Sequence, residues 1–158
     1  MINEFRIRLE ALDGVLHEVP DLTAAKEKAA SLIAGASVAR WDDPALDGIT
    51  TNTAPATAAD VSLILADVAV AETGAIGFAH RPGRSRATGL LPDRQIALLD
   101  GADLVRSMPE ALSRWFSDTQ ARAANVIFAA GPSRTADIEQ KMMLGVHAPR
   151  SLDIVLYH

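Results

Sequence analysis

One stretch near the start of the chain has the apolar spacing of an amphipathic helix. Its apolar residues recur every three or four positions and therefore share one face. Asp21 precedes the stretch and predicts an N-cap, because its carboxylate can accept hydrogen bonds from the exposed N–H groups of the first turn. Gly35 predicts the end of this helix. The buried face is expected to consist of Leu22, Ala25, Ala29, Leu32 and Ile33.

Short aliphatic runs with few charges predict most of the remaining elements as strands. Such runs are typical of strands buried on both faces of a parallel sheet. The first strand, the helix and the second strand follow one another, which favours a parallel pair joined by a right-handed crossover. An antiparallel hairpin at one side of the sheet is predicted in the middle of the chain, over 61–65, 68–70 and 74–78. The expected strands are 12–19, 37–41, 61–65, 68–70, 74–78, 95–99 continued by 104–105, 126–130 and 152–156.

Two more helices and one long loop complete the expected order. Ser107 and Glu110 form a capping box, which predicts a helix with Trp115 on its apolar face. Another helix is predicted over 136–144. Residues 80–94 are rich in Gly, Pro and Arg and predict a long loop, a kind of segment that is often functional. The sequence therefore predicts one α/β domain over residues 1–158, with a Rossmann-like, mostly parallel sheet and flanking helices.

The composition narrows the classes of function. Lys and Arg number 15 in 158 residues and the net charge is −5, which argues against nucleic-acid binding by the whole surface. The chain has no Cys, so it supplies no thiolate for a disulfide, a metal or an iron–sulfur cluster. Its four His lack the spacing of a metal site. We expect no metal, no redox cofactor and no other cofactor in this chain.

Targeting signals and membrane segments are not expected either. The first six residues do not resemble a signal peptide, which begins with a basic region followed by an apolar one. The longest apolar region, 61–71, contains Asp67 and is too short to span a bilayer. We therefore expect a cytoplasmic protein.

The segment 131–135 is the strongest candidate for a binding site. It follows the apolar run 126–130 and precedes the predicted helix, and the loop between a strand and a helix can present free backbone N–H groups to an anion. Gly131 permits close approach of the backbone. Ser133 and Thr135 offer hydroxyl groups, and Arg134 offers a planar cationic fork. The alternative is a plain turn in which Ser133 or Thr135 caps the helix.

Three other features carry candidate chemistry. The loop from His80 to Arg86 is a local basic run in an acidic protein, which points to an anionic partner or to a solvated loop. Glu72 lies between an aliphatic strand and Gly74, where burial would raise its pKa and make it a base or nucleophile; the alternative is a turn residue bonded to nearby N–H groups. His147 is a proton carrier near neutral pH or a buried structural histidine.

Taken together, these stretches resemble the LUD domain family, of the lactate utilization protein C type. The resemblance rests on 71–74, on Arg86 with 90–92 after it, on 131–139, 144–147 and 149–150, and more weakly on 41–44. It implies a fold like that of ribose-5-phosphate isomerase, glucosamine-6-phosphate deaminase and the CoA transferases. It also implies a role in oxidising L-lactate to pyruvate beside iron–sulfur partner proteins.

These observations lead to three alternative functions. The first is an accessory subunit in the oxidation of L-lactate or a related organic acid, which binds a small anion and works with iron–sulfur proteins. The second is a stand-alone enzyme of the CoA-transferase or isomerase type that uses Glu72, and the third is a regulatory anion-binding module. The expected catalytic residues are Glu72 and His147. The expected ligand-binding residues are Thr73, Gly74, Arg86, Gly131, Ser133, Arg134 and Thr135.

Overall fold

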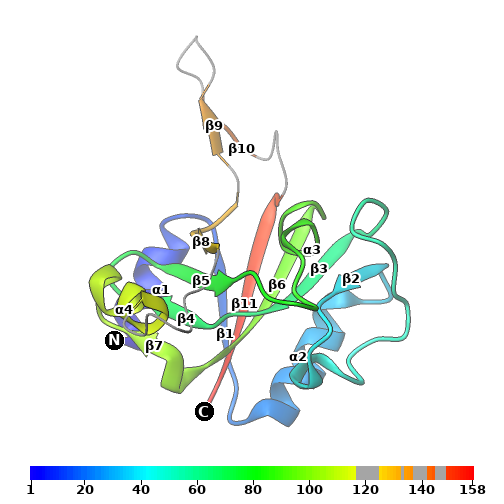
Figure 1. Cartoon of the computed structure of the whole chain (residues 1–158), viewed down its shortest axis with the longest axis horizontal. Helices are drawn as coiled ribbons and strands as arrows, with labels where there is room; N and C mark the ends of the chain where they lie inside the picture. Colours follow the sequence, from blue (N-terminus) through cyan, green and yellow to red (C-terminus); the bar gives the residue numbers. More distant parts are fainter. Residues whose placement is uncertain (117–124, 133, 137–141, 145–148) are drawn as a thin grey trace.

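A five-stranded parallel sheet forms the centre of the molecule (Figure 1). The computed structural model describes residues 1–116, 125–132, 134–136, 142–144 and 149–158. All neighbouring strands of the central sheet run parallel, as the aliphatic runs predicted. In spatial order they are β1 (Val15–Glu18), β11 (Ser151–Tyr157), β6 (Arg94–Asp100), β3 (Val61–Leu65) and β2 (Val38–Arg40).

The first two strands of the chain lie at opposite edges of this sheet. They are parallel, as expected, but three strands separate β1 from β2. The helix between them, α2 (Leu22–Ile33), crosses that distance. Asp21 is its N-cap, with the carboxylate accepting from the N–H of Ala24 at 2.8 Å. The local sequence predicts that these two strands run parallel. Which strand each of them pairs with depends on segments far away in the sequence.

A second, smaller sheet contains the predicted hairpin. Its four strands, in order, are β7 (Leu104–Val105), β4 (Val68–Val70), β5 (Ala75–Ala79) and β8 (Val126–Ala129). The pairs β4–β5 and β5–β8 are antiparallel, which confirms the hairpin. The prediction that 104–105 continues the strand before it is wrong, because β7 pairs with β4 instead. A 3-10 turn at Gly101–Asp103 separates β7 from β6 and breaks the extended run.

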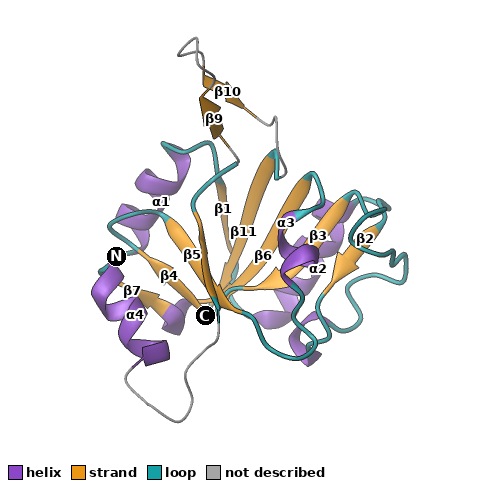
Figure 2. Ribbon diagram, turned by 45° about the horizontal axis from the view of Figure 1, so that its top comes forward, coloured by secondary structure: helices purple, strands orange, loops and turns teal. Residues whose placement is uncertain are grey.

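Different elements cover the two faces of the parallel sheet (Figure 2). On β6, Arg94 donates a hydrogen bond to the carbonyl of Leu32 in α2, whereas the next residue, Gln95, donates to the carbonyl of Gly89 in α3 (Arg86–Leu90). Since successive residues of a strand point to opposite faces, α2 and α3 lie on opposite sides of the sheet. The remaining helices are α1 (Ile2–Glu10), beside β1, and α4 (Met108–Phe116), beside β4 and β7, and a 3-10 turn lies at Pro44–Leu46.

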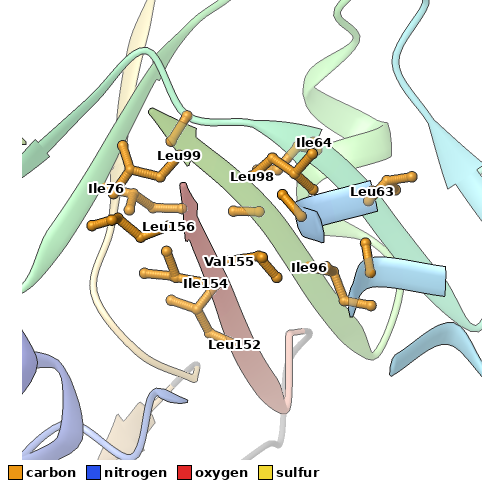
Figure 3. Packing of buried hydrophobic residues seen from close by; sticks show 14 of the residues in the cluster. Leu63, Ile64, Ile76, Ile96, Leu98, Leu99, Leu152, Ile154, Val155 and Leu156 are labelled. Carbon is orange, nitrogen blue, oxygen red and sulfur yellow. The ribbon is translucent and has the colours of Figure 1, made fainter. Parts of the chain in front are cut away.

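Aliphatic side chains fill both faces of the central strands (Figure 3). Ile76 of β5 lies toward Leu99 and Leu156 in Figure 3, so the second sheet shares the core of the first. Phe5 and Leu9 of α1 are fully buried in the same cluster. The chain therefore builds its core mostly from Ala, Val, Leu and Ile, as its low aromatic content requires.

Two local predictions are wrong, and one helix was not predicted. Helix α1 lies before residue 12, in a segment for which the sequence suggested no element. The loop predicted over 80–94 contains α3, whose N-cap position is Ser85. The helix predicted over 136–144 is replaced, in its described part, by strand: β9 (Arg134–Ala136) pairs antiparallel with β10 (Met142–Leu144). The two strands pair only with each other, so a local hairpin takes the place of the predicted helix.

Candidate functional site

Arg84 holds the basic segment of residues 80–86, the arginine loop, against the body of the protein. Its guanidinium donates to Asp67 on one side and to Asp43 on the other, each at 2.6 Å. All three side chains are largely buried, with between 11% and 16% of the side chain exposed. The guanidinium also lies 5.3 Å from the ring centroid of Trp41, in cation–π geometry. This arginine is thus part of an internal ion triad.

The electrostatics of the triad favour the charged states of Asp43 and Arg84. Burial acts to raise the pKa of Asp43, but the hydrogen bond and charge of Arg84, together with the N–H of Ala45, bring that pKa below its ordinary value. Burial likewise acts to lower the pKa of Arg84, and the two carboxylates more than offset this effect and raise it. The triad therefore behaves as a fixed structural unit at neutral pH.

The triad leaves two other arginines of the loop facing solvent. The Arg81 side chain is 53% exposed and forms a loose ion pair with Asp67, 3.8 Å away. Arg86, the first residue of α3, is exposed, and no ion pair is found for it among the described side chains. Trp41 donates from Nε1 to the carbonyl of Ser85 at 2.9 Å, which fixes the backbone just before Arg86. Part of the predicted basic site is therefore available to an anion.

Two predicted glycines lie together at the far end of the second sheet. Ile76 pairs with Ala129, and Gly74 and Gly131 continue the same β5–β8 register two residues further. Both have positive φ, +70° and +75°. A Cβ on Gly74 would lie 2.5 Å from the backbone nitrogen of Leu9, and one on Gly131 would lie 2.1 Å from the carbonyl oxygen of Leu12. The space that glycine opens here is filled by α1 and the turn after it.

Glu72 and Thr73 take part in local hydrogen bonds. Glu72 is exposed, contrary to the expected burial, and its Oε1 accepts from the N–H of Met108 at 2.7 Å. Met108 is the first residue of α4, so Glu72 caps a helix that is distant in sequence. Thr73 Oγ1 accepts from the N–H of Ala75 at 3.3 Å. These contacts match the turn alternative for Glu72, and its catalytic role stays a prediction.

The predicted residues fall into two groups separated by β5. Glu72, Thr73, Gly74 and Gly131 lie where β5 begins, whereas the arginine loop follows its last residue. At about 3.3 Å per residue the strand separates these groups by roughly 13 Å. Asp43 and Asp67, which hold Arg84, follow the carboxyl ends of β2 and β3, so the arginine loop lies at the carboxyl ends of these two strands.

For the remaining predicted site residues, the structure describes either the backbone alone or nothing. Ser133 and His147 are outside the described residues. For Arg134 and Thr135 the backbone belongs to β9. The predicted anion site required the free backbone N–H groups at the start of a helix. No helix begins over 134–136, because these residues form strand β9. Their roles as ligand-binding or catalytic residues stay predictions.

Two cavities in the described part of the chain contain none of the predicted site residues. One, of about 240 Å³, opens at the edge strand β2, lined by Val38, Arg40, Trp41, Asp42, Thr53 and Ala54. Arg40 is already paired with Asp47 at 2.9 Å, so this cavity has no free cation for an anion. The other, of about 420 Å³, lies past the carboxyl ends of β6 and β11 and includes Gly101 and His158.

The sequence did not reveal the two carboxylates of the triad. Asp43 and Asp67 lie in separate segments, and no local spacing connects either of them to Arg84. The only signal was the stretch 41–44, which contributed weakly to the family resemblance. No cluster of three or more His, Asp or Glu suited to a metal occurs among the residues that the structure describes. In the same residues, no helix combines the length and apolar character needed to cross a bilayer.

Comparison with known proteins identifies the family. Residues 35–157 match the LUD domain, which includes the triad, the arginine loop and both glycine turns. The chain belongs to the LUD domain family. This confirms the resemblance found in the sequence. The matched LUD region starts after α2, so α1 and β1 lie outside it.

Named relatives agree with this assignment. The chain is 38% identical over 103 residues to lactate utilization protein C of an Exiguobacterium species, covering 63% of this chain and 45% of that protein. It is 33% identical over 93 residues to the protein of the same name from Shouchella clausii, covering 58% and 41%. The chain thus spans less than half the length of these relatives.

A crystal structure of a DUF162 family protein from Deinococcus radiodurans has the same fold. The TM-score is 0.78, with 19% sequence identity, and the match covers 99% of this chain and 96% of that one. At this identity the likeness shows the fold alone. It supports the arrangement of a mostly parallel sheet with flanking helices that the sequence predicted.

Proposed function

We propose that this LUD domain chain is an accessory component of a system that uses L-lactate or a related organic acid. We also propose that the chain binds a small anion at the arginine loop. The observation that carries the proposal is the exposed Arg86 next to the anchored Arg84, within a region matching a family whose relatives are named lactate utilization protein C. A guanidinium that is not held by a protein carboxylate suits the carboxylate of a small organic acid.

Two features of the loop support Arg86 as the anion contact. Arg84 balances one of the two negative charges on Asp43 and Asp67, so the pair repels an incoming anion less than two free carboxylates would. Trp41 fixes the carbonyl of Ser85, which limits the freedom of the backbone that carries Arg86. A side chain on an anchored backbone loses less conformational entropy when it binds a ligand. Arg81 on the same loop adds a second positive charge nearby.

Iron–sulfur partner proteins form the second part of the proposal. The chain contains no Cys and therefore supplies no thiolate ligand for a cluster. Oxidation of a hydroxy acid releases two electrons, which need a carrier. We therefore propose that a cytoplasmic partner holds the redox centre, while this chain contributes the anion contact. Ser133, Arg134, Thr135 and His147 remain proposed contacts from the segment that follows Gly131.

A thermal-shift titration tests the anion site. The ligands are L-lactate, pyruvate, inorganic phosphate and CoA, each added to wild-type protein. A ligand present at ten times its Kd adds about 1.4 kcal/mol of stability, which raises the Tm of a chain of this size by roughly 3–6 °C. We expect a shift with at least one anion, and its loss in Arg86→Ala.

Arg114→Ala is the matched control. Arg114 is a partly exposed arginine on α4, outside the loop, that pairs with Asp103. Removing it changes the net charge by the same amount as Arg86→Ala and should leave the ligand shift intact. Equal loss of the shift in both variants would mean that the anions act through net charge alone. No shift with any of the four anions would refute the proposal of an anion site.

A further inference from the structure

Helix α3, which begins at Arg86, is held on the sheet by a small set of polar contacts. At its start, Trp41 donates to the carbonyl of Ser85. At its end, the backbone of Gly89 packs against aromatic rings: a Cβ there would lie 3.5 Å from Phe78 and 3.7 Å from Trp41. The helix has only five residues, so contacts with the sheet must supply most of its stability.

Gln95 supplies the polar contact at the end of α3. It is the second residue of β6, and its side chain is fully buried on the face that α3 covers. Its Nε2 donates to the carbonyl oxygen of Gly89. Gly89 is in the last turn of the helix, where carbonyl groups have no intrahelical N–H partner. The amide of Gln95 therefore takes the place of the missing helical donor.

A second buried polar residue lies beside Gln95 but does not bond to α3. Ser62 on β3 is in register with Gln95 and is also fully buried. Neither Ser62 Oγ nor Gln95 Oε1 has a hydrogen-bond partner among the described residues. Burial of an unpaired polar group is unfavourable, because the group loses its hydrogen bonds to water. Of these two side chains, only Gln95 donates a hydrogen bond to α3. Because its Oε1 is unpaired, this is the one hydrogen bond among the described residues that orients its carboxamide.

We propose that Gln95 is a positioning residue, which sets the place of α3 on the sheet and thereby the direction of Arg86. The part of the proposal that concerns ligand binding rests on the proposed function above, but the part that concerns α3 does not. Gln95 reaches the helix from inside the core and touches no ligand. Loss of its donor frees the end of α3, and Arg86 at the other end then samples a wider range of positions.

The experiment uses Gln95→Met, which keeps the length of the side chain and removes the donor. Trp41 reports on α3, and Trp115→Phe makes it the only tryptophan in the full chain. Freed from its anchor, α3 should shield Trp41 less, so acrylamide quenching of Trp41 fluorescence should rise at least about twofold. Inorganic phosphate serves as the anion probe, and its Kd should rise about threefold or more.

Ser62→Ala in the same background is the matched control. It removes a buried hydroxyl from the adjacent strand, but Ser62 makes no hydrogen bond to α3. It should leave the quenching of Trp41 and the affinity for phosphate unchanged. If Gln95→Met does not yield folded protein, Gln95→Leu, which has a shorter side chain, removes the same donor instead. Amide hydrogen exchange of residues 85–93 then replaces fluorescence, and exchange should become faster.

The outcomes separate this inference from the proposed function. Unchanged quenching or unchanged exchange of α3 in the folded variant overturns the positioning role of Gln95. Looser α3 with normal phosphate affinity, in a protein where Arg86→Ala abolishes binding, overturns the link from α3 to Arg86. If Arg86→Ala leaves phosphate binding intact, the anion site itself fails, while a looser α3 in Gln95→Met still supports Gln95 as the residue that positions the helix.

Discussion

Removal of Arg84 should destabilise the protein more than removal of any other arginine in its loop. Arg84→Ala leaves Asp43 and Asp67 largely buried without their cation. Breaking a fully buried ion pair in this way costs about 3–5 kcal/mol. Because the three side chains keep 11–16% of their surface exposed, water reaches them in part, and we expect a loss of about 2–4 kcal/mol in the free energy of unfolding at pH 7.

The same substitution should change how stability depends on pH. In the wild-type protein the pKa of Asp43 is lowered, so its favourable contribution is complete above the unfolded value of about 3.9 and is lost as pH falls through the folded value. Without Arg84 the burial of Asp43 remains and raises its pKa. The charged carboxylate then destabilises the variant at neutral pH, and acid relieves this effect. The difference between the two proteins should therefore shrink below pH 4.

Urea denaturation followed by circular dichroism, at several pH values between 3 and 7, measures both effects. Arg81→Ala is the control, because Arg81 belongs to the same loop but is 53% exposed and 3.8 Å from Asp67. Exposed pairs contribute about 0–1 kcal/mol, so this variant should lose little stability. The reasoning is refuted if Arg84→Ala costs no more than Arg81→Ala, or if its cost is the same at pH 3 and at pH 7.

Two further substitutions test the glycine turn and the residue before it. Gly74→Ala should cost roughly 3 kcal/mol or more by urea denaturation, since its Cβ would lie 2.5 Å from the Leu9 nitrogen at a positive φ. Gly48→Ala, with positive φ but nothing within 4 Å, should cost only about 1 kcal/mol; equal costs would contradict the packing role of α1. Glu72→Ala should lose about 1 kcal/mol through the cap on Met108, and Glu72→Gln less. Loss of a partner-independent turnover in Glu72→Gln at unchanged stability would instead reveal a catalytic carboxylate.

Much of the fold could be predicted from the chain because its elements carry strong local signals. The face of α2 and its cap at Asp21 are visible in one stretch of sequence. The aliphatic runs that became β3, β6 and β11 predicted buried parallel strands. The prediction failed where pairing decides the structure: β7 joined β4, and the segment expected to form a helix after Gly131 contains β9 and β10.

The candidate site was harder to predict, since it depends on which segments meet. Arg86 is exposed as expected, but Arg84 in the same basic run is used by Asp43 and Asp67. All three arginines of the loop lie within one short basic run, and that run does not show which of them is buried. Burial and the distance to a carboxylate, which local sequence does not contain, separate the anchor from the residue that is free to bind.

By itself, the sequence determined the fold class, the directions of the central strands and membership of the LUD domain family, because these follow from hydrophobic periodicity and from motifs within single segments. Only the tertiary structure decided that Gly74 and Gly131 lie against α1, that Glu72 caps α4, and that Gln95 reaches α3. The physical reason is that each of these contacts joins residues from separate elements. Their distances are set by the packing of the whole domain and not by the spacing of residues along the chain.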